Sequence, residues 1–228
     1  MKDRRLQTLL LASALAFLAL TAGVVLWSWI AVADSAINAS LGAYRAEPFL
    51  TIFLWVTALG ASPTAFVVCA TTACLLWVAR LPHLVLPLWV VFLGGLVTSW
   101  STKLLVGRVR PTFLDIATAS SPSFPSGHSM SAMAVYGFLA FVVLRHGPPG
   151  RLSFWMAVSF AGTIVLVGFS RMFLSLHYAS DVLGGFRVGG FWLTIGIALA
   201  RRRDLGWAAR RGSIGSTTSS IPGSAARA

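Results

Sequence analysis

The sequence is short of the residues that keep a protein soluble in water. Only 11% of its 228 residues are charged and 57% are hydrophobic, whereas an ordinary soluble domain has about 25% charged residues. This composition excludes an ordinary water-soluble globular protein. Cysteine is nearly absent as well, because two cysteines are too few for a disulfide-based scaffold or for a metal site made of four thiolates.

Acidic residues are the scarcest charged group. The chain has six Asp and Glu against 18 Lys and Arg, which gives a net charge of +12. A basic excess can serve nucleic acid, anionic lipid or an anionic substrate. The positions of the charges decide among these partners.

The sequence has long apolar runs where a soluble protein would have charged residues. A helix needs about 20 apolar residues to cross a hydrocarbon core of about 30 Å. At about 1.5 Å per residue, residues 49–79 reach about 46 Å, which is too long for one span. Ser62 and Pro63 suit a helix start and so break this run, leaving residues 49–60 as a short interfacial helix.

The predicted fold is an all-α polytopic membrane bundle of six transmembrane helices plus the interfacial helix, within residues 1–203. The first apolar run ends in Ala31, Val32 and Ala33, which resembles a signal-peptidase site. It is longer than the apolar part of a signal, about 7 to 15 residues, so we expect it to be retained. The six expected spans are residues 6–30, 63–79, 84–105, 128–144, 152–169 and 182–200.

An even number of spans places both termini on one side of the membrane. Basic residues cluster in the segments assigned to that side, which predicts that it is the cytoplasm. We expect a bacterial inner (plasma) membrane, with residues 204–228 as a disordered cytoplasmic tail that meets anionic lipid and not nucleic acid. The basic residues on this side are Lys2, Arg4, Arg5, Arg80, Arg145, Arg151, Arg201, Arg202 and Arg203.

A second group of basic residues does not follow this cytoplasmic pattern. Ionisable residues at membrane depth are costly, and they usually serve a site or an ion pair. Because acidic partners are so few, we expect an anionic ligand near the outer face. The group consists of Arg45, Lys103, Arg108, Arg110, Arg171 and Arg187.

Three polar segments return to the same membrane face in this topology. The first runs from Lys103 to Arg110-Pro111, and the second is the Pro-Ser-Gly-His sequence at residues 125–128. The third, residues 170–181, follows after two more crossings. A single pocket built from all three is therefore topologically possible.

At these segments the sequence resembles the type 2 phosphatidic acid phosphatase (PAP2) family, metal-independent membrane lipid phosphatases that share their site with vanadium haloperoxidases. The family pattern is Lys, six residues, Arg-Pro; then Pro-Ser-Gly-His; then Ser-Arg, five residues, His, three residues, Asp. The third segment matches with Ser170-Arg171, His177 and Asp181. The N-terminal third and the tail match only in hydropathy.

The resemblance implies a catalytic role for three residues. His177 would attack phosphorus to form a phosphohistidine, and Asp181, four residues further on, would orient the imidazole and stabilise its charge. His128 would protonate the leaving oxygen and then activate water.

Five further residues would bind the substrate. Lys103, Arg110 and Arg171 would hold the phosphoryl oxygens. The backbone at Ser126 and Gly127, at a helix start, would bind the same anion.

No cofactor and no metal are implied. The outer carboxylates are too scattered to build a magnesium site. They are Asp34, Glu47, Asp115 and Asp181.

Some questions stay open at this stage. Family substrates include undecaprenyl diphosphate, phosphatidic acid, phosphatidylglycerol phosphate, lipid A phosphates and sphingolipid phosphates, and the motifs do not separate them. Arg108 could hold phosphate, face lipid headgroups or pair with Asp115, and Arg187 could serve helix packing or reach the pocket. Two other classes remain as alternatives: an anionic-solute transporter with His177 as proton relay, and a catalytically silent lipid-binding relative.

Overall fold

The computed structural model describes residues 2–111 and 121–218, and every regular element within them is a helix. In chain order they are α1 (Lys2–Leu26), α2 (Ser28–Gly42), α3 (Phe49–Ala58), α4 (Ser62–Val78), the 3₁₀ helix η1 (Pro82–Leu84), α5 (Val85–Val106), α6 (Gly127–His146), α7 (Arg151–Phe173) and α8 (Ala179–Thr218).

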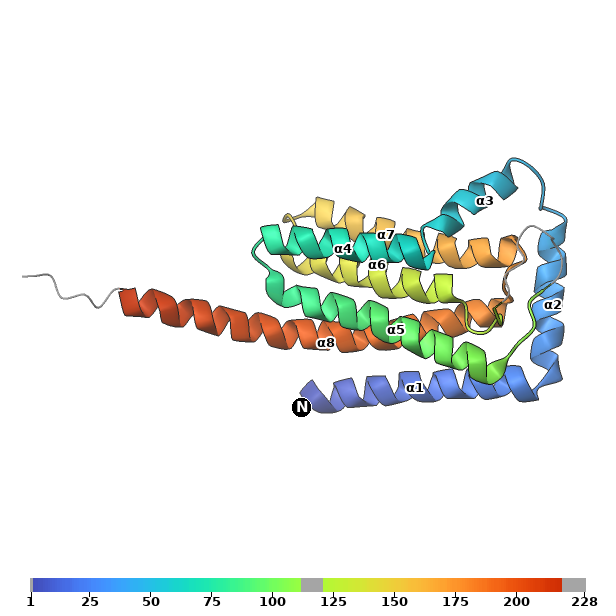
Figure 1. The fold of residues 1–228 in the computed structure, drawn as a ribbon, viewed down its shortest axis with the longest axis horizontal. Helices are drawn as coiled ribbons and strands as arrows, with labels where there is room; N and C mark the ends of the chain where they lie inside the picture. Colours follow the sequence, from blue (N-terminus) through green and yellow to red (C-terminus); the bar gives the residue numbers. More distant parts are fainter. Residues whose placement is uncertain (1, 112–120, 219–228) are drawn as a thin grey trace, which may run out of the picture.

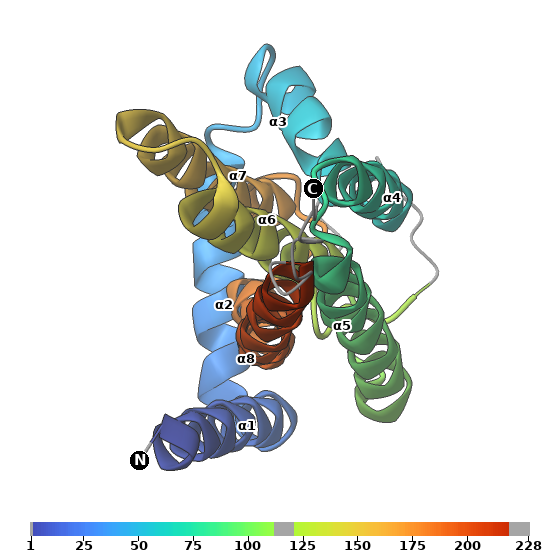
Figure 2. The ribbon, with the colours of Figure 1, turned by 90° about the vertical axis from the view of Figure 1, so that its left-hand side faces the viewer.

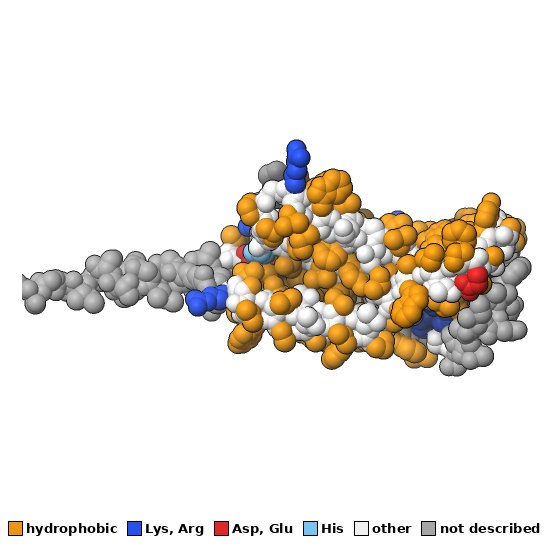
Figure 3. Space-filling view, turned by 90° about the horizontal axis from the view of Figure 1, so that it is seen from above, with side chains coloured by type: hydrophobic (Ala, Val, Ile, Leu, Met, Phe, Trp, Pro, Cys, Tyr) orange, Lys and Arg blue, Asp and Glu red, His pale blue; other side chains and the backbone are white. Residues whose placement is uncertain are grey.

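Five helical segments are long and apolar enough to cross a membrane, and they lie in α1, η1 with α5, α6, α7 and α8. The pair α3 and α4, bent by 48° at a short break, passes the same test together and would make a sixth. Hydrophobic side chains spread over much of the bundle surface (Figure 3). The predicted all-α membrane bundle is confirmed, and the chain is a multi-pass membrane protein.

The first helix is shorter than expected, and a second helix follows it. α1 ends at Leu26, where the prediction continued to residue 30, and Trp27 has extended backbone angles (φ −112°, ψ 110°). A side chain at Gly23 would approach Ile30 to 2.8 Å, so the glycine allows α2 to fold back closely. α2 then lies across one end of the bundle (Figure 1).

The last helix is longer than expected. α8 continues to Thr218, into the segment that we expected to be a disordered tail from residue 204. Leu205 and residues 208–211 are good helix formers, whereas the glycines at 206, 212 and 215 are not. The rest of that expected tail, residues 219–228, lies outside the described residues.

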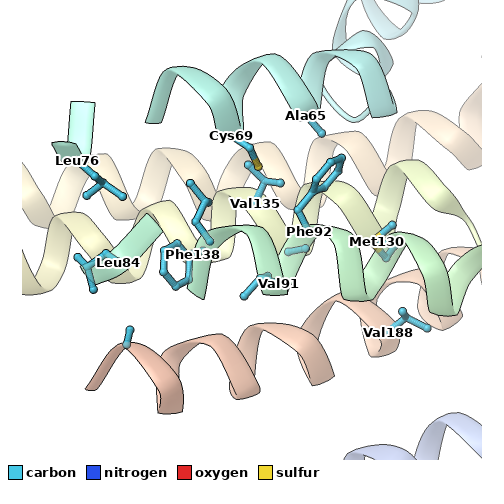
Figure 4. Close-up of a cluster of buried hydrophobic side chains, with 13 residues drawn as sticks. Ala65, Cys69, Leu76, Leu84, Val91, Phe92, Met130, Val135, Phe138 and Val188 are labelled. Carbon is cyan, nitrogen blue, oxygen red and sulfur yellow. The ribbon is translucent and has the colours of Figure 1, made fainter. Parts of the chain in front are cut away.

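The core lies where α4, α5, α6 and α8 converge (Figure 4). Cys69, Phe92, Phe138 and Val188 bring one buried side chain each from these four helices. Close packing of small residues holds α8 against α6: a side chain at Gly185 would meet the backbone oxygen of Ser126 at 2.4 Å. The starts of both helices are thereby fixed side by side.

The helix ends that carry the three polar segments lie at one end of the bundle. α5 and α7 end there, α6 and α8 begin there, and α2 covers that end (Figure 1). α6 and α8 occupy the middle, with α1, α4, α5 and α7 around them (Figure 2). The start of α1 and the far part of α8 point to the opposite end of the bundle.

Candidate active site

His177 and Asp181 lie together at the turn between α7 and α8, and both are buried. His177 Nδ1 is 3.4 Å from Asp181 Oδ2, and the same oxygen accepts the Tyr178 backbone N–H at 2.9 Å. The turn is closed by the His177 backbone N–H, which donates to the Arg171 carbonyl at 3.1 Å. His177 precedes α8, which begins at Ala179, so the expected placement of both residues on one helical turn is not seen; Asp181 instead reaches back over the start of α8 toward the imidazole.

Arg110 contacts the other side of the His177 ring. Its Nη1 lies 3.0 Å from His177 Nε2 and also donates to the Leu176 carbonyl at 2.7 Å. Because a guanidinium offers only donors, Nε2 must be the acceptor, and the ring proton must be on Nδ1, facing Asp181. The lone pair of Nε2 thus points toward the cationic side of the site.

Burial and the charges around His177 favour its neutral form. Burial, together with the positive charges of Arg171, Arg110 and Lys103, lowers the pKa of His177 well below its ordinary value. An unprotonated imidazole is the nucleophilic form. The surroundings of His177 are therefore suited to a nucleophilic imidazole.

Lys103 and Arg171 are buried cations at the ends of α5 and α7. Lys103, in the last turn of α5, donates from Nζ to the Pro122 carbonyl. Arg171, near the end of α7, donates from Nη1 to Thr57 Oγ1 at 2.7 Å, while its buried Nε has no hydrogen-bond partner within the described part of the chain. That Nε–H is free for an oxygen of a bound anion.

The start of α6 forms the facing wall. Ser126 is its N-cap, accepting the Ser129 backbone N–H at 3.4 Å, and the Ser126 N–H donates to the Asp181 carbonyl at 2.9 Å. A side chain at Gly127 would meet nothing within 4 Å, so space is open there. His128 is only partly buried, and it interacts electrostatically with His177 and the three cations.

All eight residues singled out from the sequence thus lie at this end of the bundle, on four helices and the loops beside them. Arg187, which was left between two roles, is exposed on α8. Within residues 2–111 and 121–218, no group of three or more His, Cys, Asp or Glu could hold a metal ion.

Arg108 is the site residue that sequence reasoning left out. It forms ion pairs with Asp34 on α2 at 2.8 Å and with Asp181 at 2.7 Å. Asp115, its expected partner, lies outside the described residues. The charge count could have pointed to this pairing. An Arg at membrane depth needs an acidic partner, and only four carboxylates were expected on the outer side.

Thr57 was also missed. A lone threonine in an apolar helix has no spacing pattern, and nothing in the sequence connects it with Arg171.

A family model described as the PAP2 superfamily matches residues 83–204. That segment covers more than half of the chain and contains all eight residues. The protein belongs to the PAP2 superfamily.

Individual relatives are consistent with this family. Phosphatidylglycerophosphatase B of Bacillus subtilis (strain 168) is 47% identical over 85 residues, which are 37% of this chain and 42% of the relative. Undecaprenyl-diphosphatase BcrC of the same strain is 31% identical over 118 residues, or 50% of this chain and 54% of the relative. The chain thus spans about half the length of these curated relatives or less.

A solved structure agrees over more of the chain. The crystal structure of a transmembrane PAP2-type phosphatidylglycerolphosphate phosphatase from Bacillus subtilis has a TM-score of 0.75 and 29% identity. The match covers 85% of this chain and 96% of that chain. The similarity therefore includes helices that precede the family-model match.

Proposed function

We propose that the protein is a metal-independent membrane lipid phosphatase that works through a phosphohistidine on His177. One observation carries the proposal: His177 presents Nε2 to Arg110 while Nδ1 faces Asp181, beside the buried cations Lys103 and Arg171. A neutral nucleophile surrounded by positive charge is suited to attack a phosphorus atom whose oxygens are anionic.

The first half of the reaction transfers the phosphoryl group to the enzyme. His177 Nε2 forms a bond to phosphorus, and the bond between phosphorus and the leaving oxygen breaks. His128 donates a proton to that oxygen, so that the lipid product leaves neutral at this atom. Arg110 gives up its contact with Nε2 and binds phosphoryl oxygens together with Lys103 and Arg171.

The second half releases phosphate. His128, now neutral, takes a proton from water as the water oxygen attacks phosphorus. The bond between phosphorus and Nε2 breaks, and inorganic phosphate leaves. Asp181 stabilises the positive imidazole that exists between the two halves, because its carboxylate faces the Nδ1–H.

The proposed substrate is a lipid phosphomonoester or diphosphate. The named relatives act on a phosphatidylglycerophosphate and on undecaprenyl diphosphate. Of these, phosphatidylglycerophosphate is the first to test, since that relative is the more similar of the two. The position of the site at the end of an apolar bundle supports a substrate whose tail stays in the membrane while its phosphate enters the pocket.

We place the site at the outer face of a bacterial plasma membrane, facing the periplasm or outside, with both termini in the cytoplasm. The arrangement of the bundle supports this orientation, because Arg145, Arg151 and residues 201–203 lie at the end opposite His177. Intact cells should then release phosphate from a short-chain lipid phosphate supplied outside.

Phosphate release by the purified protein in detergent tests the proposal. With EDTA present, we compare phosphatidylglycerophosphate, undecaprenyl diphosphate and phosphatidic acid. His177→Asn should lower release at least about 1,000-fold, because the nucleophile is lost. His146→Asn, at the opposite end of the bundle, is the matched control and should retain wild-type release.

The alternatives predict other results. Release that His177→Asn leaves unchanged would contradict the proposed mechanism. Uptake of an anionic solute without any phosphate release would favour the transporter, and binding of lipid without turnover would favour the silent relative.

A further inference from the structure

We propose that Asp34 of α2 is a positioning residue for this reaction, acting through Arg108 to hold Asp181 against His177 and to leave the group formed by Asp34, Arg108 and Asp181 with a net negative charge. The proposal rests on the function proposed above for His177 and Asp181. Asp34 lies outside residues 83–204, the segment that the family model matches.

Asp34 is a buried carboxylate with three donors. Its Oδ2 accepts Arg108 Nη2 at 2.8 Å and the hydroxyl of Ser180, and its Oδ1 accepts the Ser180 backbone N–H at 3.0 Å. Only 3% of Asp34 is exposed. Burying a carboxylate is costly unless hydrogen-bond donors or an opposite charge contact it, and Asp34 has both.

Arg108 connects Asp34 with Asp181. While Nη2 contacts Asp34, Nη1 donates to Asp181 Oδ1 at 2.7 Å and to Ser180 Oγ at 2.7 Å. The guanidinium also lies 4.4 Å from the centre of the Tyr178 ring. A planar group with fixed donor directions, held on both sides, fixes the orientation of the carboxylate that it contacts.

Asp181 is thereby held at both oxygens. Oδ1 accepts from Arg108, and Oδ2 accepts from Tyr178 N–H and faces His177 Nδ1. Without Asp34, Arg108 would lose the contact opposite Asp181 and would be free to turn. The carboxylate would then lose its fixed direction toward His177.

Charge gives Asp34 a second effect. Arg108 carries one positive charge between two carboxylates, so the group of three has a net charge of −1. Within residues 2–111 and 121–218, the other charged groups that act on His177 are cations: Lys103 and Arg110 from α5 and the loop after it, and Arg171 from α7. If Asp34 were neutral, Arg108 would cancel Asp181, and no net negative charge would stabilise the imidazolium that forms during phosphoryl transfer.

A second contact from α2 reaches the same turn. Asn38, one helical turn after Asp34 and also buried, accepts hydrogen bonds from Arg45 Nη2 and from Ser175 Oγ. α2 thus contacts the turn before His177 as well as Ser180 after it.

Asp34→Asn tests the proposal because it removes the charge and keeps the shape. We expect kcat to fall about 10- to 100-fold, in the range for a catalytic group moved out of place, with KM changed less than about 3-fold. Glu47→Gln is the matched control, because it removes the same charge from an exposed carboxylate in the same part of the chain. This control should keep wild-type kcat.

A double-mutant cycle separates positioning from simple support of the fold. In an Arg108→Gln background, Asp34 and Asp181 are left as like charges with no cation between them. Asp34→Asn should then leave kcat unchanged or raise it, whereas a merely structural Asp34 would lower kcat by the same factor in both backgrounds. Equal factors would overturn the proposal, and so would wild-type kcat in Asp34→Asn.

Two further variants keep the test decisive. If Asp34→Asn does not fold, Arg108→Lys tests the same connection between Asp34 and Asp181. This variant keeps the positive charge but cannot donate to both carboxylates from a planar guanidinium. Wild-type kcat in Arg108→Lys would overturn the proposal. The loss of release in His177→Asn is measured alongside. If that loss is seen while Asp34→Asn matches wild type, only the role of Asp34 fails; if it is not seen, the proposed function itself fails.

Discussion

Residues 83–204 and the helices before them contribute to the site in different ways. The later region supplies the groups that would touch phosphate, among them His128, His177 and Arg110. The earlier region, residues 2–81, supplies acceptors for two arginines of the later region: Asp34 from α2 accepts from Arg108, and Thr57 from α3 accepts from Arg171. A residue that reacts with phosphate must be of one chemical type and at a fixed spacing in the sequence. A residue that only supports it needs no more than a hydrogen-bond acceptor or a packing surface beside it.

The break between α3 and α4 is a further support from the earlier region. It is held to α6 by the Tyr136 hydroxyl, which donates to the Leu59 carbonyl at 2.9 Å. One residue on, a side chain at Gly60 would approach the His128 carbonyl to 3.0 Å and Val167 Cγ1 to 2.5 Å. The backbone of the break therefore packs directly against the start of α6, where the proposed proton donor lies.

The largest effect expected from this supporting region, after that of Asp34, is at Thr57. Thr57→Val keeps the shape of the side chain and removes the acceptor of Arg171 Nη1. A buried charged donor without its partner costs about 1 to 3 kcal/mol of unfolding free energy. We expect a lower melting temperature and about 10-fold slower phosphate release, measured in detergent with the lipid that gives the highest rate.

Thr51→Val on the same helix is the control, because Thr51 is exposed. If Thr57→Val behaved like Thr51→Val in both measurements, α3 would have no part in holding Arg171. The two regions would then be less closely connected than the contacts indicate.

The sequence predicted one of these two regions much better than the other. Lys103, Arg110, His177 and Asp181 were found because fixed spacings and the return of the chain to one membrane face bring them together. The pair of Asp34 and Arg108 was not found, because 74 residues separate its members and no periodic pattern relates them.

The fold shows the same limit. Apolar length predicted the membrane helices and the break near Gly60. It did not predict α2, because this helix has only 15 residues and mixes small and polar residues with apolar ones. The position of α2 depends on the turn after Gly23.

A smaller effect is expected at Gly60. Gly60→Ala adds a methyl group where Val167 and the His128 backbone leave no room, which costs about 1 to 3 kcal/mol of unfolding free energy. Any shift of α6 moves His128, so we expect phosphate release to fall a few-fold. Thermal unfolding and initial rates measure the two effects.

Gly162→Ala is the matched control on α7, because a side chain there meets nothing within 4 Å. Alanine is the better helix former by about 0.5 to 1 kcal/mol, so this variant should be slightly more stable and fully active. If the two variants had the same stability and the same rate, the break between α3 and α4 would not be closely packed against the start of α6.

The smallest expected effect concerns pH, and it depends on the later region alone. The pKa of His177 is lowered by burial and by Arg171, Arg110 and Lys103, so the ring stays neutral as pH falls through about 6.5. A histidine with an ordinary pKa would lose about four-fold of its neutral form between pH 7.5 and 6. We therefore expect no loss of the rate of phosphoryl transfer to His177 on the acid side at saturating substrate. Because His128 must be protonated to act as the acid in this step, any change as pH falls should be a gain.

Removing one of the cations should make the rate of phosphoryl transfer fall on the acid side. Lys103→Met takes away a positive charge that lowers the pKa of His177, so the pKa should rise and a loss of rate should appear on the acid side, in addition to a lower rate at every pH. Because saturating substrate removes the titration of the free lipid phosphate from the measurement, the remaining pH dependence belongs to the enzyme–substrate complex. A four-fold loss in the unchanged protein would mean that burial and the three cations do not lower the pKa of His177.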